Sequence, residues 1–241
     1  MDLEHIKQSV TVSSIDSPGL TPAVDRDAFA KSVRLTMEAI TTMRGADCVA
    51  YAIVGAEALH ELGFKARPVA GYASWRVGPG DSDMVVHDPN ANVSMVVMPT
   101  ATAMMFHAWI ELDTPVGVHM VDLTTFQLRD KSAALDSMDG QKTAVDFCPD
   151  YIWGTPPDPK WNAHSVTQSQ DVGVYSYKRV PEIEMKVMAG IKIKEMYDAV
   201  KAVSFVYGKI LLGESVQVIG VDKDRAVPVN HLYRPPSLKR P

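Results

Sequence analysis

The chain has only two cysteines, Cys48 and Cys148, among its 241 residues. Two cysteines cannot build a disulfide framework, which argues against a small secreted scaffold and fits a reducing compartment. Long apolar runs are missing too, since none approaches the roughly 20 residues that a membrane-spanning helix needs. The acidic segment Met1–Lys7 contains no apolar region of the signal-peptide kind. These absences predict a cytoplasmic protein without a membrane partner.

An excess of positive charge is also absent. The formal net charge is −5, and we therefore expect no nucleic-acid partner. The chain has no glycine-rich phosphate loop and no internal repeat, and its histidines lack ligand spacing on a single element. We expect no cofactor and no metal. The hydrophobic content of 46% is ordinary for a globular protein, and the length suits a single domain over residues 1–241.

What the chain does have is a cysteine, a histidine and an aspartate in the order of a thiol catalyst: Cys48, His107 and Asp122. Only a thiolate attacks well, and its pKa falls at the positive end of a helix or beside an imidazole that takes the proton. A carboxylate can then hold the imidazole in the required tautomer. The three residues are therefore a candidate catalytic triad.

Cys48 is expected to open a helix. Arg44 and Gly45 interrupt the preceding pattern, and Asp47 is a favourable cap residue. Apolar residues then recur at helical spacing up to Gly63, namely Val49, Ala52, Ile53, Ala56 and Leu59. The negative charge of Asp47 opposes thiolate formation unless its side chain is turned away from the sulfur.

The position of His107 relative to Asp122 follows from strand pairing. Residues 105–112 alternate, with Met105, His107, Trp109 and Glu111 on one face. If residues 113–116 form a four-residue hairpin loop, Leu112 pairs with Gly117 and His107 pairs with Asp122. Paired residues point to the same side of a sheet, with Cβ atoms about 5 Å apart. Trp109 and Glu111 become candidates for substrate binding, with packing beside the triad and exposure to solvent as their respective alternatives.

The remaining segments complete an α+β pattern. Helices are predicted over residues 25–43, with Asp25 as cap and Phe29, Val33, Met37 and Ile40 buried, and over 189–207. Strands are predicted over 69–77, 84–87, 93–98 and 216–221. Residues 146–161 are irregular, and their aromatic side chains Tyr151, Trp153 and Trp161 either cover one end of a cleft or bury a loop. His119 is expected to face away from His107, and Cys148 to be a structural or free thiol.

Longer motifs around these residues resemble a known family. They are Gly45-Ala-Asp-Cys48, the segment from Glu57 to Tyr72, His107-Ala-Trp-Ile-Glu-Leu112 and Val121-Asp-Leu-Thr-Thr125. Together they resemble the transglutaminase-like superfamily of cysteine enzymes, which have a papain-like fold. The resemblance covers roughly residues 30–126. It implies a catalytic core over residues 25–126, with the helix of Cys48 packed on an antiparallel sheet that carries His107 and Asp122, and an extension over 127–241 that packs on this core.

The resemblance also implies an activity. Cys48 would be the nucleophile, His107 the base and Asp122 the orienting carboxylate. We expect hydrolysis of a peptide or small amide through a thioester, because water needs no second binding site. An acyl or amine transferase is an alternative, of the transglutaminase type or of the arylamine N-acetyltransferase type, which Arg44-Gly-x-x-Cys48 also resembles. A non-catalytic binding protein that retains the fold is an alternative of another class. Whether the chain forms a homo-oligomer stays open.

Overall fold

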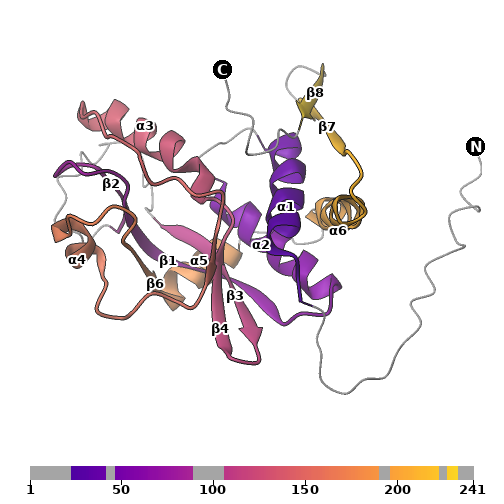
Figure 1. Cartoon of the computed structure of the whole chain (residues 1–241), viewed down its shortest axis with the longest axis horizontal. Coiled ribbons are helices and arrows are strands. Elements are labelled where there is room, and N and C mark those ends of the chain that lie inside the picture. Colours follow the sequence, from indigo (N-terminus) through magenta and orange to yellow (C-terminus); the bar gives the residue numbers. More distant parts are fainter. Residues whose placement is uncertain (1–22, 42–46, 89–105, 190–195, 223–226, 233–241) are drawn as a thin grey trace, which may run out of the picture.

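The computed structural model describes residues 23–41, 47–88, 106–189, 196–222 and 227–232 (Figure 1). In chain order, its elements are α1 (Arg26–Ile40), α2 (Cys48–Glu61), β1 (Ala66–Arg76), β2 (Met84–His87), β3 (His107–Thr114), β4 (Gly117–Asp122), the 3-10 helix η2 (Thr125–Gln127), α3 (Leu128–Asp139), β5 (Ile152–Gly154), α4 (Ala163–Gln168), β6 (Tyr175–Arg179), α5 (Pro181–Ala189), α6 (Tyr197–Leu211), β7 (Gln217–Asp222) and β8 (Val227–Leu232). The predicted α+β class is confirmed. The predicted strand over 93–98 lies outside the described residues.

A six-stranded antiparallel sheet forms the centre of the molecule, with strands in the order β2-β1-β3-β4-β5 and β6 paired with β1. Gly71 pairs with both His107 of β3 and Arg179 of β6, and Ala73 pairs with both His87 of β2 and Tyr177 of β6. A strand residue can pair with one neighbouring strand on each side. Strand β6 therefore lies along one edge of β1, and β3 and β2 lie end to end along the other edge. This arrangement brings the ends of β2 and β3 together.

Helix α2 covers one face of the sheet, and α1 packs on α2. The Asp25 side chain accepts a hydrogen bond from Ala28 N at 2.9 Å and caps α1 as predicted. Phe29, Val33 and Met37 of α1 are at most 1% exposed, but Ile40 is 55% exposed, so its predicted burial is wrong. Ile40 is the last residue of the helix, where the chain turns into an extended cap at Thr41.

Helix α2 is buried on nearly all sides, because it lies between the sheet on one side and α1 and α6 on the other. Its last residue is Glu61 and its cap is Leu62, and the predicted stop Gly63 follows with a positive φ of 87°. A Cβ at Gly55 would come within 2.8 Å of Ile110 and Leu123. This glycine therefore allows α2 to approach β3 closely, and the same packing sets the height of Cys48 above the sheet.

The hairpin of β3 and β4 differs from the predicted register. Thr114 pairs with Gly117 and Leu112 with His119, so the loop contains two residues and not four. The Thr114 hydroxyl closes this turn, donating to the Gly117 carbonyl at 2.6 Å. The pairing is thus displaced by two residues, and Asp122 lies diagonally from His107 instead of opposite it. A displacement by two preserves the face of each side chain, so Asp122 still points to the side of His107.

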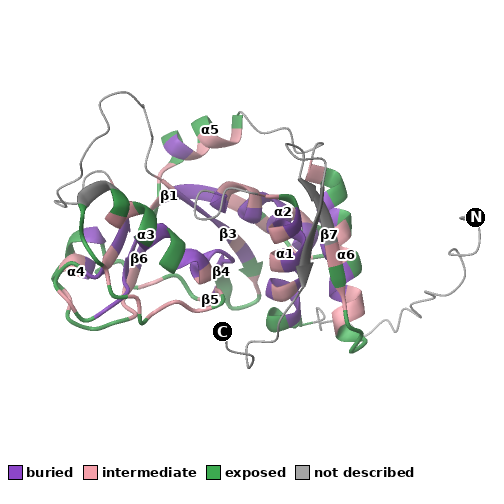
Figure 2. Ribbon diagram, turned by 90° about the horizontal axis from the view of Figure 1, so that it is seen from above, coloured by how far each residue is buried: buried purple, intermediate pink, exposed green. Residues whose placement is uncertain are grey.

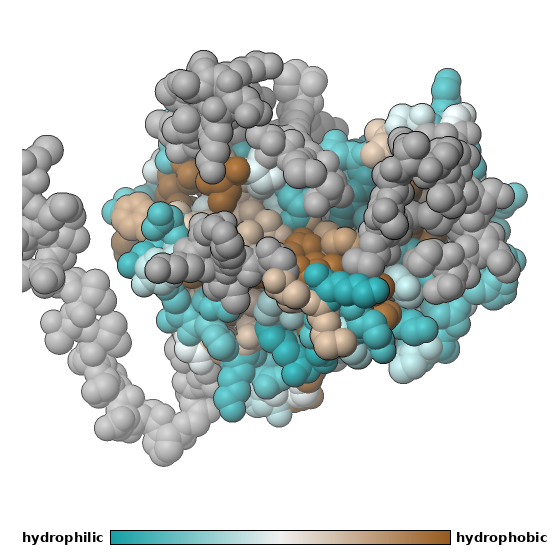
Figure 3. Space-filling view, turned by 180° about the vertical axis from the view of Figure 1, so that it is seen from behind, coloured by the Kyte–Doolittle hydropathy of each residue, from teal (hydrophilic) through white to brown (hydrophobic). Residues whose placement is uncertain are grey.

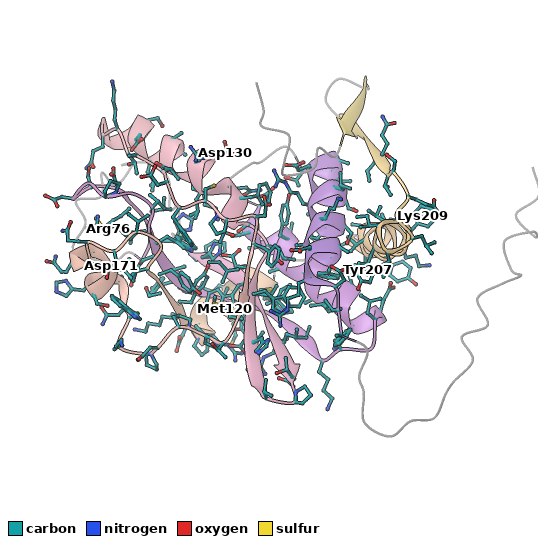
Figure 4. All side chains as sticks on the ribbon, in the orientation of Figure 1. Arg76, Met120, Asp130, Asp171, Tyr207 and Lys209 are labelled. Atoms are coloured by element: carbon teal, nitrogen blue, oxygen red, sulfur yellow. The ribbon has the colours of Figure 1, made fainter. Side chains whose placement is uncertain are left out.

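The second half of the chain does more than pack on the first. Strands β5 and β6 join the central sheet, so the predicted boundary at residue 126 does not separate two structural parts. Helix α6 confirms residues 197–207 of the predicted helix over 189–207, and residues 190–195 lie outside the described ones. Strand β7 confirms the predicted strand near 216–221. Tyr207 of α6 lies against the start of α1, where Asp25 N donates to its hydroxyl at 3.1 Å (Figure 4).

The irregular segment around β5 packs on α1. Tyr151 donates to Asp27 at 2.5 Å, and the Trp153 ring lies 5.9 Å from that of Phe29. Tyr151 and Trp153 are thus partly buried against the core, which favours the alternative in which these aromatic residues bury a loop.

Burial is concentrated where the sheet meets the helices, in β1, β3, α1 and α2 (Figure 2). The face seen from behind is mostly hydrophilic where it is described, with hydrophobic residues in separate patches (Figure 3). Several large apolar side chains stay exposed on α6 or directly after it, namely Tyr197, Phe205, Leu211 and Leu212. Within the described ranges, no helix is both long and apolar enough to cross a bilayer.

Candidate active site

Cys48 is the first residue of α2, as predicted, and it is 5% exposed. The preceding Asp47 occupies the cap position, but its side chain makes no cap hydrogen bond. Its Oδ2 accepts instead from the Thr41 hydroxyl at 2.8 Å. The carboxylate is thus engaged with the end of α1, and the first turn of α2 presents its unpaired N–H groups beside the sulfur.

His107 and Asp122 form a fully buried pair. His107 Nε2 lies 2.7 Å from Asp122 Oδ2, and both side chains are 0% exposed. Because Nε2 is held by the carboxylate, Nδ1 is the ring nitrogen left for a thiol. It has no hydrogen-bond partner among the described residues, and Cys48 lies close enough to shift the pKa of this imidazole. The structure therefore brings together the three residues that the sequence selected from α2, β3 and β4.

Asp122 is held by donors from three directions. Thr124 donates to its Oδ1 through both the backbone N–H, at 2.8 Å, and the hydroxyl, at 2.9 Å. The Tyr177 hydroxyl donates to Oδ2 at 2.6 Å, and it accepts in turn from Trp75 Nε1 at 2.9 Å. These bonds fix the orientation of the carboxylate, and with it the orientation of the His107 ring.

Aromatic side chains enclose the imidazole. The rings of Trp75, Tyr177 and Trp109 lie 4.9, 5.9 and 6.4 Å from that of His107. Trp109 is 4% exposed and packs beside the triad, which was the alternative to its predicted role in substrate binding. These rings exclude water, so electrostatic interactions within the site are stronger than they would be at the surface.

The environment of Cys48 favours its thiolate. Burial raises the pKa of the thiol, but this effect is outweighed by the nearby His107 imidazole, the charge of Lys131 and the N–H of Ala108, all of which lower the pKa. The pKa of Cys48 therefore lies below its ordinary value.

The environment of His107 favours its imidazolium. Burial and the charge of Lys131 lower the pKa of His107, but Asp122 and Cys48 raise it more, and the result is a pKa above the ordinary value. Burial raises the pKa of Asp122, and this is outweighed by His107, Lys131 and Tyr177, which hold it well below the usual range. A lowered thiol pKa and a raised imidazole pKa are what a thiolate–imidazolium pair requires.

Two further titratable residues of the site were not singled out as functional by the sequence. The Lys131 side chain of α3 is 3% exposed, and its Nζ donates to the Thr124 hydroxyl at 3.2 Å. The His87 ring at the end of β2 lies 5.7 Å from that of His107. Burial and the charges of Lys131 and His107 keep the pKa of His87 well below its usual value, so its imidazole is neutral. Lys131 had a sequence signal, since it shares a helical face with Leu128 and Leu135.

The other sequence candidates lie away from the triad. Glu111 forms ion pairs with Arg67 at 2.6 Å and Arg179 at 3.5 Å, which is closer to the exposed alternative than to its predicted role in substrate binding. That role stays a prediction. His119 pairs with Leu112 on the opposite face from His107, as predicted. Cys148 is a free thiol that donates to the carbonyls of Thr125 and Phe126. In the described part of the chain, no group of three or more histidine, cysteine or acidic residues could hold a metal ion.

Tyr177 offers a direct test of how the site is held. Replacing Tyr177 with phenylalanine removes one donor to Asp122 and the acceptor of Trp75, both of them buried. Unfolding free energy should fall by about 1–3 kcal/mol. Urea denaturation at pH 7 measures this change.

The matched control is Tyr175→Phe. Tyr175 precedes Tyr177 by two residues on the same strand, so the two side chains share a face. Among described residues the Tyr175 hydroxyl has no hydrogen bond, so the change should stay within about 0.5 kcal/mol. Equal losses in both variants would contradict the role assigned to the Tyr177 hydroxyl.

Comparison with known proteins adds a similarity of fold. No family model and no curated protein matches the chain. A crystal structure of a genomics target superposes with a TM-score of 0.52 at 14% identity, covering 90% of this chain and 95% of that chain. At this identity the similarity concerns the fold alone, and it extends over both halves of the chain.

Proposed function

We propose that the protein catalyses thiol-dependent acyl chemistry, with hydrolysis of an amide or peptide bond as the reaction. The observation that carries the proposal is the joint burial of Cys48, His107 and Asp122, with Nε2 of the imidazole held at 2.7 Å by a carboxylate. A nucleophile, a base and an orienting carboxylate are what this chemistry needs, and the buried His107–Asp122 pair beside Cys48 supports the proposal. The substrate is a peptide or small amide.

The reaction proceeds in two halves. The Cys48 thiolate attacks the carbonyl carbon, and the negative oxygen is stabilised by N–H groups at the start of α2. The carbon–nitrogen bond then breaks, the imidazolium of His107 gives its proton to the departing amine, and a thioester remains. Water next gives a proton to His107 and adds to the carbonyl carbon of the thioester. The tetrahedral intermediate then breaks its carbon–sulfur bond, which returns the thiolate and releases the acid. An amine in place of this water would give transfer.

The finer fold assignment belongs to the same proposal. The transglutaminase-like, papain-like core predicted over residues 25–126 is supported by a helix that begins at Cys48 and packs against the strands of His107 and Asp122. A cytoplasmic location is likewise proposed, and two free thiols support it.

The test is the pH dependence of Cys48 alkylation by iodoacetamide, with sites assigned by mass spectrometry. Cys48 should react as a thiolate at pH values well below the ordinary thiol pKa of about 8.5. Cys148 is the internal control, because it bonds only to backbone carbonyls in the described structure. His107→Ala should abolish the reaction of Cys48 at neutral pH and leave that of Cys148 unchanged.

A Cys48 that reacts like Cys148 at every pH would contradict the proposed chemistry. The alternative of a binding protein that retains the fold would then be favoured, since a thiol that is 5% exposed suits a packing role as well. If Cys48 is activated, a screen with amide substrates, with and without added amines, distinguishes hydrolysis from transfer, and Cys48→Ala should lack either activity.

A further inference from the structure

The charge balance of the buried site points to a fourth member. His107 as imidazolium and Asp122 as carboxylate balance one another, and both are 0% exposed. A thiolate at Cys48 adds a second negative charge in a position that is 5% exposed. An unbalanced charge in such surroundings is costly, because little water is present to solvate it. A stable thiolate therefore needs another cation.

Lys131 is the buried cation next to this group. It lies in the first turns of α3, which packs beside β2 (Figure 1). Its Nζ sits 5.4 Å from the centroid of the Trp75 ring, and that ring packs edge-on against His107 at 4.9 Å. Within the described ranges, no carboxylate comes within ion-pair distance of Nζ, so the ammonium is not neutralised by a direct partner.

A directional hydrogen-bond chain joins Lys131 to the triad. Nζ donates to the Thr124 hydroxyl at 3.2 Å, and this hydroxyl donates to Asp122 Oδ1 at 2.9 Å. Thr124 N also donates to the same oxygen, at 2.8 Å. Lys131 thus polarises the donor that holds Asp122, and its charge acts across the low-dielectric interior on the thiolate and on the imidazole.

We propose that Lys131 is a positioning residue of the site, whose buried ammonium balances the second negative charge and so holds Cys48 as a thiolate. The inference rests on the proposed thiolate chemistry of Cys48. Lys131 touches no reacting atom in this role. It acts through Cys48, His107 and the Thr124–Asp122 bond, and it makes the group of two anions and two cations electrically neutral.

Other charged and titratable groups face the site from each neighbouring element. Asp122 comes from β4, Tyr177 from β6 and His87 from β2, where burial and two nearby cations keep the pKa of His87 low. Burial and the charge of Asp122 raise the pKa of Tyr177, whose hydroxyl stays protonated. Asp47 precedes Cys48 but is bonded to Thr41. Lys131 is therefore the cation that distinguishes this site from an isolated triad.

The test compares Lys131→Met with Lys131→Arg, both in a Cys148→Ser background where Cys48 is the single thiol. Thiolate absorbance at 240 nm is followed against pH, with Cys48→Ser for subtraction. In Lys131→Met the midpoint should move up by about one pH unit, which lowers iodoacetamide alkylation about tenfold on the acid side. Lys131→Arg keeps the charge, and its midpoint should stay near that of the parent.

The His107 titration, followed by NMR of its ring proton, separates a charge effect from damage to the triad. Removing a nearby cation raises the pKa of every neighbouring group, so the pKa values of Cys48 and His107 should both rise in Lys131→Met. Disruption of the pair with Asp122 would raise the pKa of Cys48 but lower that of His107. Methionine fits the apolar contact with Trp75, which favours folding of the variant.

The outcomes for Lys131 and for the proposed function are distinguishable. The parent midpoint tests the function: an ordinary thiol value contradicts the activated Cys48. The difference between parent and Lys131→Met tests the inference, whatever the parent value is. An unchanged midpoint, an equal rise in Lys131→Arg, or a fall in the pKa of His107 would each overturn the role of Lys131.

Discussion

Replacing Asp122 with alanine should lower the unfolding free energy by about 3–5 kcal/mol, the loss typical when one partner of a buried ion pair is removed. The variant leaves the His107 imidazole, two donors from Thr124 and the Tyr177 hydroxyl without their shared acceptor. It also removes the charge that raises the pKa of His107. Urea denaturation at pH 7 measures the loss.

The pH dependence of this loss has a definite sign. The pKa of Asp122 is lowered in the folded protein, so its contribution is present above the unfolded value of 3.8 and is lost as pH falls through the folded value. The pKa of His107 is raised, so its contribution is present below the unfolded value of 6.5 and is lost as pH rises through the folded value. The difference in unfolding free energy between parent and variant should therefore be largest between the two unfolded pKa values, 3.8 and 6.5.

A matched control for Asp122 is Asp136→Ala. Asp136 also accepts from the N–H and the hydroxyl of one threonine, Thr143, at 2.9 and 2.7 Å, but it holds no histidine and is only half-buried. Its replacement should cost about 1 kcal/mol. If Asp122→Ala cost no more than this control, the buried ion pair would not be what stabilises the site.

Replacing Gly71 with alanine should have a comparable effect for a different reason. A Cβ at this position would lie 2.0 Å from the Lys178 carbonyl oxygen and 2.8 Å from Val180 N, both of them backbone atoms. Neither can move without separating β6 from β1. We expect a loss of about 3 kcal/mol, at the upper end for overpacking, by urea denaturation. Because β6 carries Tyr177, its displacement should also weaken the hold on Asp122.

Gly154→Ala provides the comparison for Gly71. Gly154 is likewise a strand residue of the same sheet, and no atom lies within 4 Å of the position of its Cβ. Its replacement should change stability by no more than about 0.5 kcal/mol. Similar stabilities for the two alanine variants would mean that β6 can move away from β1 at little cost, which would contradict the expected clash at Gly71.

Local periodicity and residue type were enough to predict the cysteine helix, the strands of His107 and Asp122, and the face that these two residues share. The predicted hairpin register was wrong by two residues, because loop length cannot be read from Asp113–Val116 alone. The predicted contact between His107 and Asp122 still forms, because side chains alternate along a strand and a displacement by two residues keeps each side chain on the same face. The long side chains then span the diagonal.

Only the tertiary structure decided what surrounds the triad. Tyr177 reaches Asp122 from 55 residues further along the chain, and that contact depends on β6 pairing with one edge of β1, which no local pattern specifies. Lys131 reads in the sequence as a helix residue beside an apolar stripe, and its burial follows from α3 packing over Trp75. Periodicity is a property of neighbouring residues, whereas the order of strands and the burial of a charge depend on contacts between distant ones. The sequence by itself therefore determined which residues form the candidate triad, and the tertiary structure decided the charge and hydrogen bonds that surround it.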